Sequence, residues 1–422
     1  MNHIYQTMID ILKQELVPAL GCTEPIALAY ASAKAREVLG EMPDELYVEC
    51  SGNIIKNAKS VIVPRTKNLK GIEAAAIVGM LGGNPDKKLE VLTTVTEDNI
   101  EEAKRLLERK YCKTSLLDTQ EKLHIIVHMK KGEHSALVEL VKTHTGIIKI
   151  EKDDKVIFID EVTEEAINAV DYNVLNIADI LNFAENVEIT EIKPILVRQI
   201  EYNTKIAKEG LYHTYGVNVG AALIDIYGDD VKIRAKAMPA AGSDARMNGC
   251  ELPVIINSGS GNQGMTVSLP VIEFGNMLNV DENKLLRALC ISNLIAIYQK
   301  YQIGRLSAYC GAVSAAAGAG AGIAYLYGGK EEEITQTLVN TLANVSGIVC
   351  DGAKSSCAAK IASAVDAAIV ATMISLRGKG FVAGDGIVKD TIQKTIDGVV
   401  TLAKEGMKET DEVILKIMMN EG

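Results

Sequence analysis

A long stretch without a single charged residue, 306–329, constrains the fold of this chain more than any other feature. It is dominated by Ala and Gly, with three Tyr and two Ser. A membrane-spanning helix is normally rich in Leu, Ile, Val and Phe instead. The stretch therefore predicts a tightly packed helix of a soluble protein, whose small side chains let another backbone approach closely.

The overall composition fits a soluble protein with two domains. The chain has 422 residues, of which 48% are hydrophobic, and it contains no Trp and only four Phe, so its core must be built from small and aliphatic side chains. A net charge of −11 argues against a nucleic-acid partner. The N-terminus lacks the basic and apolar regions of a signal peptide, so we expect a cytoplasmic protein without a membrane partner.

The first half mixes strand and helix patterns, and we expect an α+β domain at 1–190 with a mainly antiparallel sheet. Helix patterns occupy 71–81 and 97–110, and Thr96 can cap the second of these, which has acidic residues in its first turn. The dipeptide Lys131-Gly132 is typical of a hairpin turn between two strands. The runs with strand character are 46–52, 88–94, 123–130, 135–143, 147–151 and 155–160.

The second half carries helical periodicity, and we expect a mostly α-helical domain at 191–422. A strand pattern is evident only at 254–257. The helical runs are 197–208, 285–299, 314–327, 331–346, 358–377 and 390–405.

The chain contains eight cysteines, an unusual number for a protein without an export signal. Disulfides are not the default use of cysteine in such a protein, and metal, cluster or catalytic use becomes more prominent. The spacing of the cysteines lacks the C-x2-C pairs that are typical of zinc sites and the closely spaced cysteines that are typical of ferredoxins. The eight are Cys22, Cys50, Cys112, Cys250, Cys290, Cys310, Cys350 and Cys357.

Cys310, Cys350 and Cys357 lie at the ends of expected elements. Loops and helix N-termini can gather thiolates there and stabilise the charge of a thiolate-ligated cluster. The alternative is three buried structural cysteines, because the spacing from Cys350 to Cys357 is not a specific motif. We read the cysteines at 50, 112, 250 and 290 as structural.

Cys22 lies where one helix is broken and the next can start. Gly21 precedes it, Pro25 follows, and Thr23 or Glu24 can cap the new helix. A thiol at a helix N-terminus is expected to have a lowered pKa, which suits a catalytic role. On the residues alone, a buried structural thiol is an equal alternative.

Several polar residues are candidates for binding the carboxylate of a substrate. The loop 257–264 (NSGSGNQG) can present backbone N–H groups to an anion, although a plain connecting loop is the alternative. His144 ends an expected strand, where a solvated strand end is the alternative. The substrate-binding candidates are Ser51, Asn53, Lys56, His144, Asn257, Ser260, Asn262, Gln263 and Arg305.

Five motifs follow one another along the chain: Gly21–Pro25 (GCTEP), Ser51–Asn53 with Lys56-Asn57, Gly259–Gly264 (GSGNQG), Ser307–Gly311 (SAYCG) and Cys350–Cys357 (CDGAKSSC). In this order they resemble the motifs of the L-cysteine desulfidase family, which is related to the iron–sulfur L-serine dehydratase α chains. The resemblance covers almost the whole chain.

The resemblance implies one [4Fe–4S] cluster per subunit, held by Cys310, Cys350 and Cys357. It implies α,β-elimination of L-cysteine to pyruvate, ammonia and hydrogen sulfide, with Cys22 as the base. In the serine dehydratases a cysteine near the C-terminus also ligates the cluster, whereas this sequence has none after Cys357. That departure favours a cluster in which one iron has no protein ligand, and this iron would act as a Lewis acid on the substrate thiolate.

Three other functions stay open. The first is an L-serine dehydratase with the same cluster chemistry. The second is a pyridoxal phosphate eliminase, in which Lys354 would form the Schiff base, although this leaves the three cysteines without a role. The third is a non-enzymatic iron–sulfur redox sensor, for which the sequence offers no DNA-reading motif as an output. We expect a homodimer, the commonest assembly of such enzymes, acting on a small amino acid.

Overall fold

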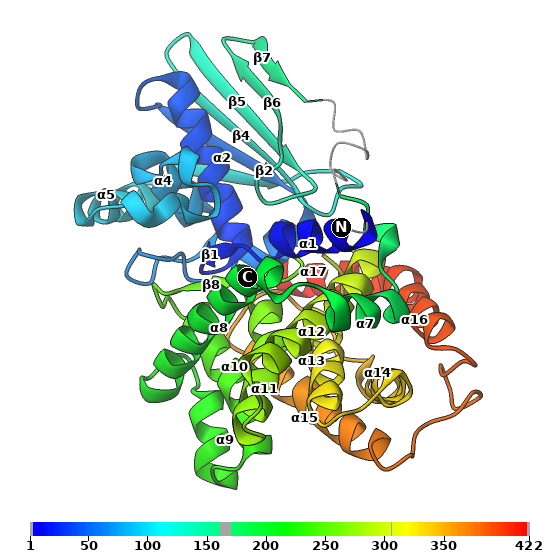
Figure 1. The fold of residues 1–422 in the computed structure, drawn as a ribbon. Coiled ribbons are helices and arrows are strands. Elements are labelled where there is room, and N and C mark those ends of the chain that lie inside the picture. The colour runs from blue at the N-terminus through cyan, green and yellow to red at the C-terminus, as the bar shows by residue number, and fades with distance from the viewer. Residues whose placement is uncertain (1–2, 161–169, 305, 420–422) are drawn as a thin grey trace.

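A computed structural model describes residues 3–160, 170–304 and 306–419, and it places a sheet-containing part above a helical part (Figure 1). The sheet has six strands in the order β3-β2-β4-β5-β6-β7, antiparallel except for the parallel pair β2 and β3. The expected antiparallel sheet is thus confirmed, including the hairpin at Lys131-Gly132. The strands are β2 (Glu45–Cys50), β3 (Cys112–Leu116), β4 (His124–Lys131), β5 (His134–Val141), β6 (Ile147–Lys152) and β7 (Lys155–Ile159).

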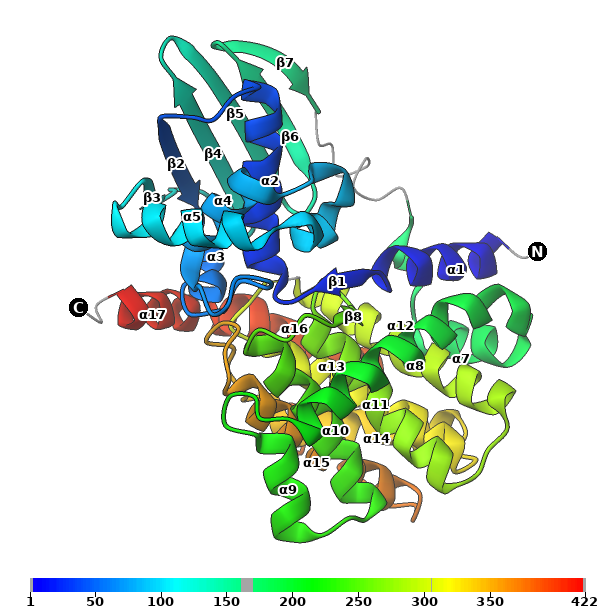
Figure 2. The same cartoon turned by 90° about the vertical axis from the view of Figure 1, so that its left-hand side faces the viewer.

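Helices cover one face of this sheet (Figures 1 and 2). Inward-facing residues alternate along β2 and β4, so Val48 and Val127 are fully buried in the core between the sheet and its helices. Thr96 caps α5 with a capping box, as its place before an acidic turn predicts. The covering helices are α2 (Thr23–Leu39), α4 (Gly71–Gly82) and α5 (Glu97–Glu108), with the short α3 (Gly52–Ala58) below them.

The strand expected at 88–94 is wrong. The chain forms η1 (Pro85–Thr94) there, two short 3₁₀ segments joined by a kink at Lys88, whose φ is 48°. The cause lies just upstream, because the Asn84 side chain accepts a hydrogen bond from the Asp86 N–H and Pro85 fixes its own φ for a turn. The turn formed by Asn84 and Pro85 therefore outweighs the strand pattern of residues 88–94 that follow it.

The second half is helical, as its periodicity predicts. Its core also takes in α1 (His3–Glu15), through Met8 and Leu12, so the first helix packs with the second half. The expected boundary at 190 stays a prediction; the sheet ends at Ile159 and α7 begins at Ile177. The elements are η2 (Tyr172–Val174), α7 (Ile177–Asn186), α8 (Ile189–Tyr212), α9 (Val219–Tyr227), α10 (Val231–Met247), α11 (Gly261–Met277), α12 (Glu282–Ile303), α13 (Gly311–Leu326), α14 (Glu331–Val345), α15 (Cys357–Ser375), α16 (Ile392–Thr401), η3 (Leu402–Gly406) and α17 (Lys408–Met419).

The charge-free stretch forms α13, a buried helix at the centre of this half. A Cβ atom at Gly318 would lie 2.5 Å from the carbonyl oxygen of Ser292, so a side chain there would keep α12 from its close approach. One helix among the described residues, α15, is long and apolar enough to cross a membrane, but 56% of its apolar window is buried inside the protein. Small residues therefore serve close helix packing here, as the sequence predicts.

Two contacts between distant segments of the described chain help to join the halves. The short strand β1 (Pro18–Leu20) pairs with β8 (Pro253–Ile255), which brings the start of α2 next to the start of α11. At the other end of the chain, α17 returns to lie against α3 (Figure 2). Both contacts meet near the seam between the halves, and the candidate site lies there.

Candidate active site

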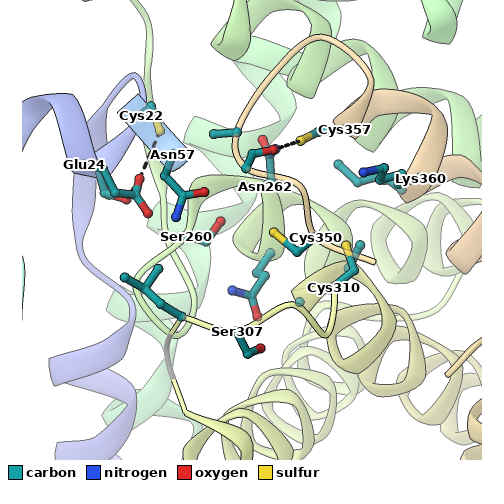
Figure 3. A pocket seen from close by; sticks show the side chains of 18 of the residues that line it. Cys22, Glu24, Asn57, Ser260, Asn262, Ser307, Cys310, Cys350, Cys357 and Lys360 are labelled. Atoms are coloured by element: carbon teal, nitrogen blue, oxygen red, sulfur yellow. Dashed lines mark hydrogen bonds between the residues drawn. The ribbon is translucent and has the colours of Figure 1, made fainter. Parts of the chain in front are cut away.

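A cavity of about 100 Å³ lies at the seam between the two halves (Figure 3). Cys22 and Glu24, from the start of α2, stand on one wall, and Cys310, Cys350 and Cys357 stand on the facing wall. The thiols that the sequence singled out are therefore brought together from three distant segments. Other polar residues that line the cavity are Thr23, Asn57, Arg246, Ser260, Asn262, Gln263, Lys300, Ser307 and Lys360.

Cys22 is placed by a tight turn and by strand pairing. Gly21 has a φ of 64°, and a Cβ atom there would lie 2.1 Å from Pro64, so only glycine fits this turn. Cys22 lies at the N-terminus of α2, as the sequence predicts, and it is itself the N-cap in place of the expected Thr23 or Glu24. The Thr23 hydroxyl donates to the carbonyl of Gly259 at 3.1 Å, which ties this turn to the glycine-rich loop.

Backbone hydrogen bonds bring Cys310 and Cys350 together. The Cys310 N–H donates to the Ile348 carbonyl at 3.1 Å, and the Cys350 N–H donates to the Ala308 carbonyl at 2.6 Å. Cys310 is the N-cap of α13, and Cys357 is the first residue of α15. The left-handed turn at Gly352 (φ 96°) closes the loop between Cys350 and Cys357.

The three thiols on this wall are donors of the kind that hold an iron–sulfur cluster, which binds to a protein through cysteine thiolates. Within the described residues, no group of three His, Cys, Asp or Glu side chains is arranged for a single metal ion. Burial raises the pKa of Cys310, and the nearby Cys350 and Cys357 raise it further, so three thiolates need positive charge between them.

Positive charge also surrounds the thiols. Lys300 is buried and donates to the Ser307 hydroxyl at 3.4 Å, and burial lowers the pKa of its ammonium group to about 8. Lys360, which pairs with Asp351, lines the same wall. The N-termini of α2, α11, α13 and α15 all contribute residues to the cavity, and helix N-termini favour anions. The cavity is thus suited to thiolates and to an anionic group of a ligand.

The pKa of Cys22 does not follow the expectation from its position. Burial and the Glu24 carboxylate raise the pKa of this thiol well above its usual value, so the expected lowering is wrong. The Cys22 thiol donates to Glu24 Oε2 at 3.0 Å. Although burial opposes ionisation, interactions with His144 and Cys22 bring the pKa of Glu24 to about 2. Cys22 is therefore a protonated thiol beside a buried carboxylate.

The glycine-rich loop supplies part of the predicted polar lining. Ser260, Asn262 and Gln263 line the cavity at the start of α11, together with Arg246 from α10. A Cβ atom at Gly261 would lie 2.4 Å from Arg246 Nε, so glycine makes room for the guanidinium group. Asn262 Oδ1 accepts a hydrogen bond from Arg246 at 3.1 Å.

Asn257 and His144, also predicted to bind substrate, do not line this cavity. Asn257 is fully buried and donates to Asn293 Oδ1 at 3.0 Å, which fixes the loop from behind. His144 lies behind Glu24, with Nε2 3.9 Å from Glu24 Oε1. Arg305 lies outside the described residues.

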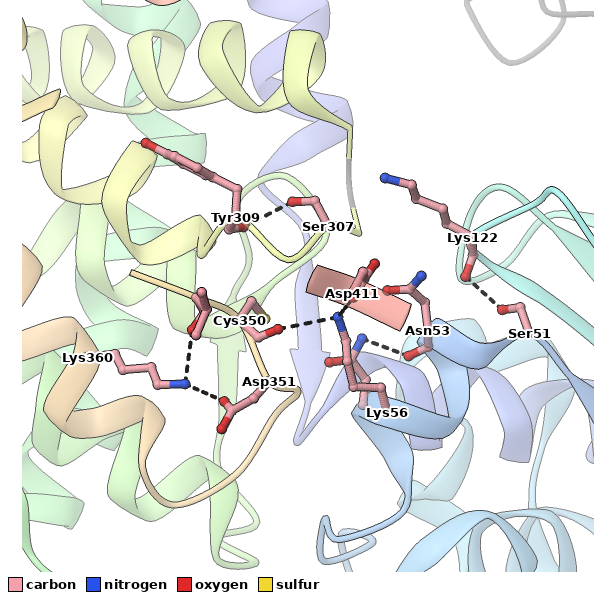
Figure 4. Close-up of polar contacts among 12 residues, drawn as sticks. Ser51, Asn53, Lys56, Lys122, Ser307, Tyr309, Cys350, Asp351, Lys360 and Asp411 are labelled. Carbon is pink, nitrogen blue, oxygen red and sulfur yellow. Dashed lines mark hydrogen bonds and ion pairs between the residues drawn. The ribbon is translucent and has the colours of Figure 1, made fainter. Parts of the chain in front are cut away.

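Ser51, Asn53 and Lys56 line a different cavity, of about 470 Å³, between α3 and α17 (Figure 4). The Lys56 ammonium group forms an ion pair with Asp411 of α17 and donates to the Cys350 carbonyl at 3.4 Å. Lys56 thus supports the cysteine loop from outside the thiol cavity. Their predicted role in substrate binding stays a prediction.

Four charged residues of the cavity are not among the site residues that the sequence predicts: Glu24, Arg246, Lys300 and Lys360. The sequence marks Glu24 only as a helix cap, although its place two residues after Cys22 is a usable signal. Arg246 and Lys300 lie inside long helices, and no local pattern distinguishes them from surface charges. Their low exposure, 3% and 2%, is visible only in the folded chain.

Comparisons with known proteins identify the family of this chain. The family described as "Serine dehydratase alpha chain" matches residues 86–416, a span that includes the three facing cysteines. A protein of Lachnoclostridium phytofermentans named "UPF0597 protein" is 80% identical, over 99% of this chain and 100% of its own length. A protein of the same name from Treponema denticola is 50% identical, over 99% of this chain and 98% of its own. The chain therefore belongs to the serine dehydratase alpha chain family.

Proposed function

We propose that this protein is an iron–sulfur-dependent lyase that eliminates hydrogen sulfide from L-cysteine and yields pyruvate and ammonia. Family membership supports a lyase-type enzyme. The observation that carries the proposal is the single cavity in which three thiols face Cys22. A volume of about 100 Å³ suits a small ligand such as an amino acid.

Cys310, Cys350 and Cys357 would hold a [4Fe–4S] cluster, each through its thiolate. When bound, a cluster with one iron free of protein ligands supplies a Lewis acid for the substrate's sulfur. Lys300 and Lys360 balance the negative charge of the thiolates on this wall. The N-termini of α13 and α15 add N–H groups on the same side.

Cys22 would accept the proton from Cα of the substrate. As the thiolate takes this proton, the C–H electron pair forms the Cα–Cβ double bond and the Cβ–S bond breaks, releasing sulfide. Aminoacrylate then tautomerises to the imine and hydrolyses to pyruvate and ammonia. The high pKa of Cys22 makes its thiolate a strong base, but the thiol must first lose its own proton.

The second candidate substrate is L-serine, which the family match favours. The same elimination would then release hydroxide instead of sulfide. The pyridoxal phosphate alternative has less support, because Lys354 pairs with Asp351 at 3.5 Å and is not among the residues lining the cavity. A redox sensor would not need a thiol and a carboxylate such as Cys22 and Glu24 facing its cluster.

Anaerobic purification followed by absorption spectroscopy, iron analysis and a pyruvate assay tests the proposal. We expect an iron–sulfur absorption band and pyruvate from L-cysteine, with L-serine assayed in parallel. Cys22→Ala should keep the iron and lose turnover, whereas Cys350→Ala or Cys357→Ala should lose both. Cys290→Ala, at a buried position in α12 away from the cavity, is the matched control and should keep both.

The alternatives predict different results. Protein without iron whose colour is removed by a carbonyl reagent would indicate pyridoxal phosphate. Iron without turnover of either amino acid would indicate a sensor. An active Cys22→Ala variant would rule out Cys22 as the base.

We also propose that the enzyme is a cytoplasmic homodimer. Two-fold dimers are the commonest assembly of soluble oligomers. Light scattering coupled to gel filtration measures the mass directly, and a single species near the 45.4 kDa of one chain would contradict the dimer.

A further inference from the structure

Two polar side chains of the cavity play no part in the chemistry proposed above. Arg246 is 3% exposed, and its Nε has no hydrogen-bond partner among the described residues. Gln263 is 5% exposed, and its Oε1 also lacks a partner within that part of the chain. Both residues line the cavity. A buried polar atom without a partner is costly, so these atoms indicate a ligand with matching polar groups.

Arg246 lies next to an uncapped helix start. Ser260, the N-cap of α11, makes no side-chain hydrogen bond to the first N–H groups of the helix. The first N–H groups of a helix have no partner within it, and together with an Arg side chain they form a typical site for a carboxylate. Gly261 keeps this corner open, because a Cβ atom there would contact the guanidinium group.

Glu24 offers the opposite charge on the same side of the cavity. Its Oε2 accepts a hydrogen bond from Cys22 at 3.0 Å and lies 3.1 Å from the Thr23 hydroxyl, whose single proton is shared with the Gly259 carbonyl. Its Oε1 faces His144 at 3.9 Å. A carboxylate has about four acceptor positions, so Glu24 can accept a further donor. A buried anion in a cavity is suited to an ammonium group.

We propose that Arg246 and Glu24 are specificity-determining residues that bind the α-carboxylate and the α-ammonium group of an amino acid. The choice of ligand class rests on the proposed function, whereas the two charged groups are features of the folded chain. The amino acid would lie with its charged groups toward the wall of Cys22 and its β-substituent toward the three cysteines (Figure 3).

This placement has a consequence for Cys22. The charge of Glu24 helps to keep that thiol protonated, whereas the charge of Arg246 opposes this effect. An ammonium group bound at Glu24 would cancel part of its charge and make the thiolate easier to form. Substrate binding would then help to prepare the base.

Three inert ligands test the proposal by calorimetric titration. L-Alanine carries both charged groups and lacks a leaving group, propionate lacks the ammonium group, and ethylamine lacks the carboxylate. We expect the wild-type protein to bind L-alanine more tightly than either analogue, on the order of 10- to 100-fold, as for a lost hydrogen bond to a charged group.

The variants should remove this discrimination selectively. Arg246→Gln should abolish the preference for L-alanine over ethylamine, and Glu24→Gln should abolish the preference over propionate. Arg246→Lys keeps the charge without the fork of donors, and it should retain part of the preference if the glutamine variant fails to fold. Arg234→Gln, on the same helix but paired with Glu273 outside the cavity, is the control and should bind as wild type.

The proposal would be overturned if the Arg246 and Glu24 variants lost affinity equally for all three ligands, or if they lost no affinity for any of them. Turnover of L-cysteine is measured separately on the same preparations. Selective binding without any pyruvate would refute the proposed elimination and leave the amino-acid site standing. Turnover with unselective binding would refute only the roles of Arg246 and Glu24.

Discussion

Replacing Asp411 with Ala should destabilise the protein strongly, because it would leave the buried Lys56 ammonium group without its anionic partner. The side chains of Lys56 and Asp411 are 1% and 15% exposed. Removing one partner of a buried pair costs roughly 3–5 kcal/mol. After the change, the Cys350 carbonyl, 3.4 Å away, would be the one hydrogen-bond partner left to Lys56 within the described part of the chain. The adjoining cavity can admit water, so we expect the low end, about 3 kcal/mol.

Urea unfolding followed by circular dichroism measures this effect. With a slope of about 3 kcal/mol per molar urea, the midpoint should fall by about 1 M. Asp390→Ala is the control, since Asp390 pairs with Lys394 on the surface, where both side chains are at least 60% exposed. An exposed pair of this kind contributes only about 0–1 kcal/mol, so the control should hardly shift.

A second variant separates the buried charge from the loss of contacts. Lys56→Met combined with Asp411→Leu removes both charges and keeps apolar volume, so it should recover most of the lost stability. If Asp411→Ala shifts the midpoint no more than Asp390→Ala, the pair does not stabilise the fold and the reasoning is wrong. A raised KM without a loss of stability would instead favour a role of this cavity in substrate binding.

Three further predictions follow from packing and charge. Gly264→Ala should lower the free energy of unfolding in urea by about 1–3 kcal/mol, because its Cβ would lie 2.0 Å from the carbonyl oxygen of Ile255. Gly347→Ala, which has open space around it, is the control and should leave the stability unchanged, and equal effects of the two variants would contradict the prediction. Burial raises the pKa of Asp244 from 3.8 to about 6, so its contribution to stability is present below pH 4 and is lost as the pH rises through 6. Asp244→Asn should therefore raise the melting temperature relative to wild type at pH 8 but not at pH 4. A gain in melting temperature at pH 4 but not at pH 8 would refute the prediction. Burial also raises the pKa of Cys22, so mass spectrometry should find slow alkylation of this thiol by iodoacetamide at pH 7, and fast alkylation would contradict the buried site.

Local features of the fold could be predicted from the sequence because their causes are local. The cap at Thr96 and the helix starts at Cys310 and Cys357 depend on a few neighbouring residues. The wrong strand prediction at 88–94 has a local cause too, because the turn chemistry of Asn84 and Pro85 lies outside the run that carries the strand pattern.

The candidate site was predictable only in part. Cys22 and the glycine-rich loop could be singled out because they combine unusual residues with chain breaks. The partner of Lys56 could not, since Asp411 lies 355 residues away along the chain. The pKa of Cys22 was also out of reach, because it depends on burial and on the direction of the Glu24 side chain.

The site lies at a seam between two separate hydrophobic cores, one beneath the sheet and one among the helices. Cys22 belongs to the start of α2, which packs against the sheet, and the three facing cysteines belong to the helical half. A slight rotation of one half would change the distance across the cavity while both cores stay intact. We therefore expect mild heat or low urea to abolish catalysis before any loss of helix content is seen. Catalytic activity would then report on the alignment of the halves, and circular dichroism on the integrity of each.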